Sequence, residues 1–129
     1  MSDNFVYKLE TTKTFEQVVS DLEATSTENM FRVLHTHNVQ ETLAEKGFEI
    51  QPLKIMEVCN SGFANKALKL DMNVTMFMPC KYVVAQQDNK ITVSLMLPSV
   101  IADFINNDDL RNMANEVELT LKKIMEDSV

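Results

Sequence analysis

The segment from Cys80 to Leu97 constrains the fold more than any other part of the chain. Between Ile91 and Leu97, aliphatic residues occupy every second position, which is the period of a strand with one face against a core. Only Gln87–Asn89 separate the strand that contains this run, Lys90–Leu97, from a second apolar stretch, Cys80–Gln86. Because a turn this short joins antiparallel strands, the segment predicts a β-hairpin and, with it, an antiparallel sheet.

Two long helices are expected to accompany this sheet. From Leu110 to Ile124, apolar residues recur every three or four positions behind a cap at Asn106 or Asn107. An earlier helix begins after Thr14, whose hydroxyl can accept the N–H of the third helical residue. Both patterns describe amphipathic helices that bury one side.

The remaining patterns complete a series of strands and short helices. We expect strands at 4–10, 30–37 and 54–59, and short helices capped by Asn38 and Ser61. The alternation of Met72, Val74, Met76 and Met78 predicts a further strand face. The sum is a single α+β domain over residues 1–129, a two-layer sandwich with a mainly antiparallel sheet of about five strands and two long helices on one face.

Composition narrows the class of partner. The 129 residues carry a formal net charge of −7, and the twelve Lys and Arg are scattered along the chain. An acidic protein repels phosphate backbones, so we expect no nucleic-acid partner. No segment approaches 18 consecutive apolar residues, so we also expect no membrane span and a cytoplasmic location. In that compartment the two cysteines are expected to be reduced thiols, metal ligands or redox groups.

Several segments together resemble the domain of unknown function family 302. The resemblance spans roughly residues 14 to 98 and is carried by Phe31–Asn38, Glu41–Gly47, Glu57–Asn60, Ala67–Leu68 and Met78–Cys80. It implies a small two-layer α+β protein that pairs as a homodimer, and it implies no particular reaction.

The residues with the clearest chemical potential lie in these family-like segments. His35 and His37 are the only histidines, and strand spacing sets them about 7 Å apart on one face, a separation that two ligands of one transition metal ion can span. If Cys59 and Cys80 end neighbouring strands, the four residues form a candidate metal site. The alternative is that both histidines are half-buried structural residues. Asn38, where the family more often has Asp, carries no charge for a metal or proton-transfer role.

Each cysteine also has two interpretations. Cys59 precedes a helix start, where partial positive charge lowers a thiol pKa, so it is a candidate redox nucleophile with Cys80 as the resolving thiol. Alternatively, both are small buried hydrophobes. Asn60, which follows Cys59, either fixes the turn or hydrogen-bonds a ligand.

We therefore expect a homodimeric binding module for a transition metal or a small ligand, with a pocket formed by His35, His37, Cys59, Asn60 and Cys80. Asn38 is a further ligand-binding candidate. A thiol-dependent redox protein and a purely structural module with methionine-rich contact surfaces are the alternatives; no catalytic residue and no cofactor is assigned.

Overall fold

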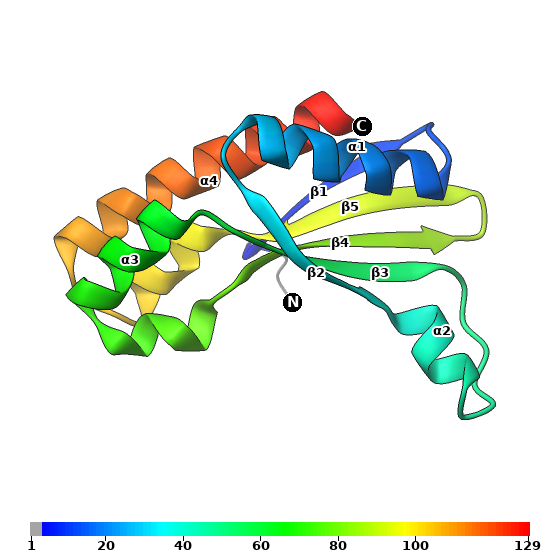
Figure 1. The fold of residues 1–129 in the computed structure, drawn as a ribbon, viewed down its shortest axis with the longest axis horizontal. Helices are drawn as coiled ribbons and strands as arrows, with labels where there is room; N and C mark the ends of the chain where they lie inside the picture. The colour runs from blue at the N-terminus through cyan, green and yellow to red at the C-terminus, as the bar shows by residue number, and fades with distance from the viewer. Residues whose placement is uncertain (1–3) are drawn as a thin grey trace.

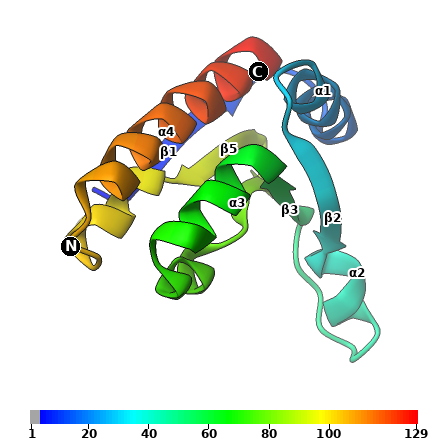
Figure 2. The ribbon, with the colours of Figure 1, turned by 60° about the vertical axis from the view of Figure 1, so that its left-hand side comes forward.

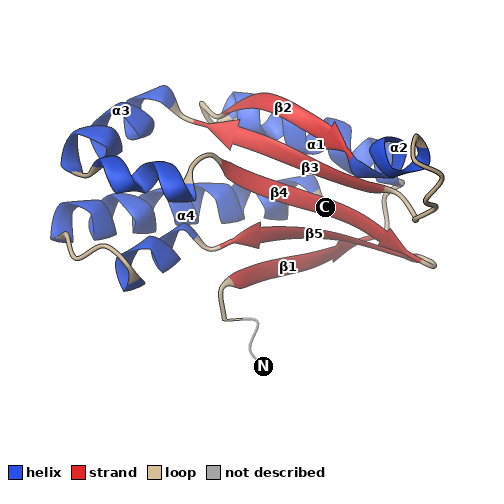
Figure 3. Ribbon diagram, turned by 90° about the horizontal axis from the view of Figure 1, so that it is seen from below, coloured by secondary structure: helices blue, strands red, loops and turns tan. Residues whose placement is uncertain are grey.

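The computed structural model describes residues 4–129, which form one antiparallel sheet with helices on one of its faces (Figures 1 and 3). The strand order is β1-β5-β4-β3-β2. The strands are β1 (Val6–Thr11), β2 (Arg32–Asn38), β3 (Leu53–Cys59), β4 (Cys80–Gln87) and β5 (Lys90–Met96). The predicted α+β class and the antiparallel five-stranded sheet are confirmed.

The helices form three groups. The two long helices, α1 (Phe15–Glu28) and α4 (Asp108–Ser128), lie together on one face of the sheet. Beyond one end of the sheet, α3 (Ser61–Leu70) is followed by two 3₁₀ helices, η1 (Met72–Phe77) and η2 (Pro98–Asp103). The short α2 (Val39–Ala44) stands apart from the other helices, beyond the end of β2 (Figure 2).

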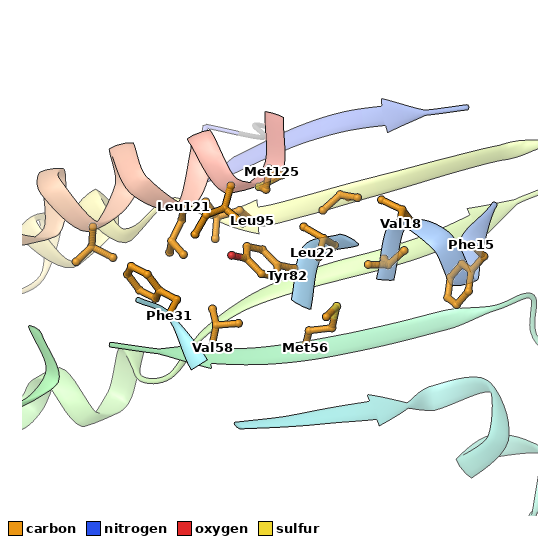
Figure 4. Close-up of a cluster of buried hydrophobic side chains, with 14 residues drawn as sticks. Phe15, Val18, Leu22, Phe31, Met56, Val58, Tyr82, Leu95, Leu121 and Met125 are labelled. Atoms are coloured by element: carbon orange, nitrogen blue, oxygen red, sulfur yellow. The ribbon is translucent and has the colours of Figure 1, made fainter. Parts of the chain in front are cut away.

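The main core lies between the sheet and the two long helices (Figure 4). Every second residue of the central strands points into it, which is why the hairpin pattern was so regular in the sequence. The Tyr82 hydroxyl is buried there and lies 3.0 Å from the Ser26 Oγ, so both polar groups have a partner. The fully buried side chains include Val18, Leu22, Met56, Val58, Tyr82, Val84, Val93, Leu95, Leu121, Ile124 and Met125.

A second, smaller core lies under α3, η1 and η2. It is formed by Val74, Ile101, Ile105, Leu110 and Ala114, so the first half of α4 belongs to this core and its second half to the main one. The helix therefore connects the two packed regions.

Of the predicted helix caps, those of α1 and α4 are confirmed and that of α3 is wrong. Thr14 caps α1 by accepting the Gln17 N–H at 3.1 Å, and Asn107 caps α4, as predicted. Ser61 does not cap α3. The cap is the preceding residue, Asn60, whose side chain accepts the Phe63 N–H.

The predicted strand over Met72–Met78 is wrong. Asp71 caps η1 by accepting the Asn73 N–H at 2.8 Å, and the chain forms a 3₁₀ helix. Of the alternating side chains, Val74 is buried while Met72 and Met76 are exposed, so the alternation did not mark one face of a strand.

Strand β2 also differs from its prediction. Met30 lies in a turn with φ 65°, and the strand begins at Arg32. A bulge follows: Val33 pairs with Val58 and His35 with Glu57, so Leu34 is an extra residue. Val33 and His35 consequently face opposite sides of the sheet, not the same side.

Candidate ligand pocket

Both cysteines lie where neighbouring strands meet the lobe formed by α3, η1 and η2. Cys59 is the last residue of β3, and Cys80 is the first residue of β4. In the register of these strands, Cys80 pairs with Val58, the residue before Cys59. Antiparallel pairing therefore brings two thiols that are 21 residues apart in sequence to the same end of the sheet.

Asn60 fixes the path of the chain at this point. Its Oδ1 accepts the Phe63 N–H at 3.0 Å and caps α3, while its Nδ2 donates to the Met30 carbonyl at 2.9 Å. The side chain thus links the start of α3 to the turn before β2. Of its two predicted roles, the structure shows the turn-fixing one.

A pocket of about 320 Å³ lies between the main core and the second core. Its walls come from the ends of β3 and β4, from α3, η1 and η2, and from the first half of α4. Phe31 and Phe63, whose ring centroids are 6.4 Å apart, form part of one side. Glu57, Asn60 and Lys81 are the polar residues in a lining that is otherwise apolar or sulfur-containing.

Sulfur-bearing side chains are concentrated around this pocket. The chain has nine methionines and two cysteines. Ten of them lie within the described residues 4–129, and six of these line the pocket: Cys59, Cys80, Met76, Met78, Met96 and Met113. Methionine adapts its shape readily and its sulfur makes favourable contacts with aromatic rings, so such a lining suits an apolar or aromatic guest.

Burial governs the acidity of both thiols. It raises the pKa of Cys59, and it raises that of Cys80 to about 11, with the neighbouring Cys59 adding to the effect. Desolvation penalises the thiolate, so the pKa of each thiol rises, where the sequence predicted a lowered pKa for Cys59. At pH 7, a thiol with the pKa of Cys80 is ionised in only about one molecule in ten thousand. Cys59 and Cys80 are not joined in a disulfide.

The histidines lie on the sheet face opposite α1 and α4, and neither lines this pocket. Their ring centroids are 4.3 Å apart and nearly perpendicular. His37 Nε2 lies 3.1 Å from Oε2 of Glu57 on the next strand. Among residues 4–129, no three His, Cys, Asp or Glu side chains are arranged to hold a metal ion. The structure thus brings the two cysteines and Asn60 to one pocket and places the two histidines elsewhere.

Asn38 has a local role. Its Oδ1 accepts the Glu41 N–H at 3.0 Å, and it is the residue that ends β2 and caps α2. It does not line the pocket.

Comparison with known proteins identifies the family of this chain. The family model described as "Domain of unknown function DUF302" matches residues 7–128. The chain belongs to this family. A solved DUF302 structure, the "uncharacterized conserved protein DUF302 from Bacillus stearothermophilus", is similar at a TM-score of 0.91 and 28% identity. The match covers 97% of this chain and 98% of that one. No curated protein matches the chain.

In this DUF302 protein, the sequence did not predict the wall of the pocket that lies opposite the sheet. Phe77, Ile101 and Met113 line it from three different elements, and Lys81 adds a charge beside Cys80. The signal in the sequence for this part of the pocket was the row of methionines before Cys80, although its alternation wrongly predicted a strand.

None of the described helices is both long and apolar enough to cross a bilayer.

Proposed function

We propose that this DUF302 protein binds a small, mainly apolar molecule in the pocket between α3 and α4. The observation that carries the proposal is the pocket itself, about 320 Å³ of space lined by aromatic, aliphatic and sulfur-bearing side chains. Binding sites for small molecules are concave and mostly apolar with a few polar groups, and this lining has that composition.

The volume and lining indicate the size of the guest. An engineered apolar cavity of about 150 Å³ holds benzene, so a pocket twice as large accommodates about two fused rings. Glu57 and Lys81, which are paired across β3 and β4, are the charged residues at the edge of this lining. A bicyclic, mainly aromatic molecule fits the volume and the apolar lining.

The protonated state of the thiols favours binding over redox chemistry. A nucleophilic cysteine needs a lowered pKa, whereas burial raises the pKa of both Cys59 and Cys80. We therefore assign the thiols a role as polarizable lining. We also favour an apolar guest over the transition metal ion that the sequence suggested, because the histidines do not line the pocket.

We further propose that the protein acts as a cytoplasmic homodimer with reduced thiols. The cytoplasm keeps thiols reduced, and two cysteines that form no disulfide are compatible with that compartment. The surface of the sheet opposite the long helices supports the pairing of two copies of the chain.

The methionine methyl groups allow a direct binding test. We expect a titration of ¹³C-methyl-methionine protein with indole, followed by NMR, to shift the signals of Met76, Met78, Met96 and Met113. Met30 and Met72 serve as controls within the same molecule, because both are exposed and neither lines the pocket. Single Met→Leu variants assign the signals.

The pair Met72 and Met76 provides the sharpest comparison. Both lie on η1 and both are highly exposed, but only Met76 lines the pocket. A saturable shift at Met76 and none at Met72 supports the proposal. Equal shifts at both, or no saturation at any pocket methionine, would overturn it.

A further inference from the structure

The helix α2 and the loop after it, residues 39–50 and hereafter the arm, contain no fully buried apolar side chain, although Val39 and Leu43 are half-buried. No residue of α2 is buried, and in the loop Phe48 is 64% exposed and Ile50 36% exposed. A helix of six residues is unstable in water by itself and normally depends on packing. The arm therefore presents apolar side chains with little to pack against in its own chain.

The sheet face opposite α1 and α4, hereafter the open face, is apolar where it crosses the central strands. The register places Leu53 and Ile55 of β3 beside Ala85 and Val83 of β4 on this side. An antiparallel sheet with one solvated face normally shows polar residues there. Strands β3 and β4 instead carry apolar residues on both faces, as a strand covered on both sides does.

Charges on the two surfaces are complementary. On the open face, Lys8, Arg32 and Lys81 form no salt bridge with any described residue. The arm carries Glu41, Glu45 and Glu49, which are likewise without a salt bridge among residues 4–129, and a single basic residue, Lys46. Three unpaired cations on a protein of net charge −7 thus lie on the one face that the helices leave uncovered.

The arm also projects to the side of the sheet on which the open face lies (Figure 1). A hollow of about 360 Å³ lies between them, lined by Val39 and Thr42 of the arm and by His37, Ile55, Glu57 and Lys81 of the sheet. The unpaired charges of the arm are mainly acidic, and those of the open face are basic, because Glu10 and Glu57 on that face already pair with Lys90 and His37. In a dimer with two-fold symmetry, the arm of each copy can therefore contact the open face of the other, so the complementary contact forms twice.

We propose that the arm of each copy packs on the open face of a second copy, and that this contact forms the homodimer. The inference rests on the homodimer in the proposed function and specifies its interface. It places Phe48 and Ile50 against the apolar strip of β3 and β4, and the glutamates of the arm near the lysines of the open face. Aromatic anchors inside a ring of charges are typical of protein–protein interfaces.

A charge-swap experiment tests this pairing. One variant makes the arm basic (Glu41→Lys, Glu45→Lys), and the other makes the open face acidic (Lys8→Glu, Lys81→Glu). In sedimentation experiments we expect wild-type protein to dimerise and each variant alone to dissociate at least about 100-fold more readily, since like charges then face each other. An equimolar mixture restores dimers, because both contacts of the mixed dimer are complementary. Labelling one variant with ¹⁵N identifies the mixed dimer by native mass spectrometry.

Two matched controls separate the interface from general charge effects. Lys66→Glu with Lys69→Glu makes the same charge change on exposed positions of α3 and leaves the dimer intact. Phe48→Ser weakens the dimer at least about tenfold, whereas Phe104→Ser, at a somewhat more exposed phenylalanine outside the arm, does not.

The outcomes distinguish the interface from the dimer itself. A wild-type protein that stays monomeric overturns both. A wild-type dimer that neither charge variant weakens overturns the interface and leaves the homodimer standing. Dissociation of both variants without recovery in the mixture also overturns the packing of arm on open face, because it shows that the two surfaces do not meet.

Discussion

Ala67 on α3 lines the pocket, and replacing it with leucine tests whether the pocket has room for a larger side chain. The change adds three carbon atoms at a half-buried position. Burying them from water contributes up to about 2.4 kcal/mol at about 0.8 kcal/mol per carbon. Ordering the longer side chain costs about 0.5–1 kcal/mol. We therefore expect Ala67→Leu to raise the free energy of unfolding by about 1 kcal/mol.

The sign of the change decides the test. In a site that is already close-packed, the same substitution costs about 1–3 kcal/mol. Urea denaturation measures the difference, with Ala24→Leu on the exposed side of α1 as a control that stays within about 0.5 kcal/mol of wild type. A loss of 1 kcal/mol or more in Ala67→Leu would refute the reasoning. The stabilised variant should also lose the indole-induced shifts, since the side chain occupies the guest's place.

Three further predictions concern the fold and its pH response. Tyr82→Phe leaves the buried Ser26 hydroxyl without its partner and should destabilise the protein by about 1–3 kcal/mol in urea, part of which the added Ser26→Ala change recovers. Asn60→Ala should cost more than the roughly 1 kcal/mol typical of a lost cap, and more than Asn38→Ala, because Asn60 holds a second backbone bond; equal losses in thermal unfolding would contradict this. Burial raises the pKa of Cys80 from 9.0 to about 11, so the stability it contributes is complete below pH 9 and falls as the pH rises to 11. In Cys80→Ala, the urea midpoint should decline less steeply over that interval.

Strand periodicity was readable in the central hairpin, where one face of each strand packs on the long helices without a bulge. In β4 and β5 the buried side chains, including Tyr82, Val84, Val93 and Leu95, occupy alternate positions, so sequence and structure agree. In β2 the bulge at Leu34 shifts the alternation by one residue, which no pattern of apolar residues announced. The methionine row before Cys80 failed for another reason, since methionine is common both on strands and in irregular packed segments.

The sequence singled out only those pocket residues that lie at the strand ends. The sequence placed Cys59 and Cys80 at strand ends but left open whether those strands are neighbours, and the register brings them to the same end of the sheet. The opposite wall is built from η1, η2 and α4, whose relation to the sheet depends on how the second core packs. No spacing in the sequence encodes that packing. The histidines were grouped with the cysteines by residue type, whereas the pairing of β2 with β3 sets them beside Glu57.

The measurement that tests the binding proposal most directly is the diffraction of a crystal exposed to iodobenzene, located by the anomalous signal of iodine. The account predicts one strong site between α3 and α4, beside Cys59, Cys80 and Met113, and its loss in Ala67→Leu. Iodine bound only elsewhere, or a pocket that stays empty while other sites fill, would contradict it.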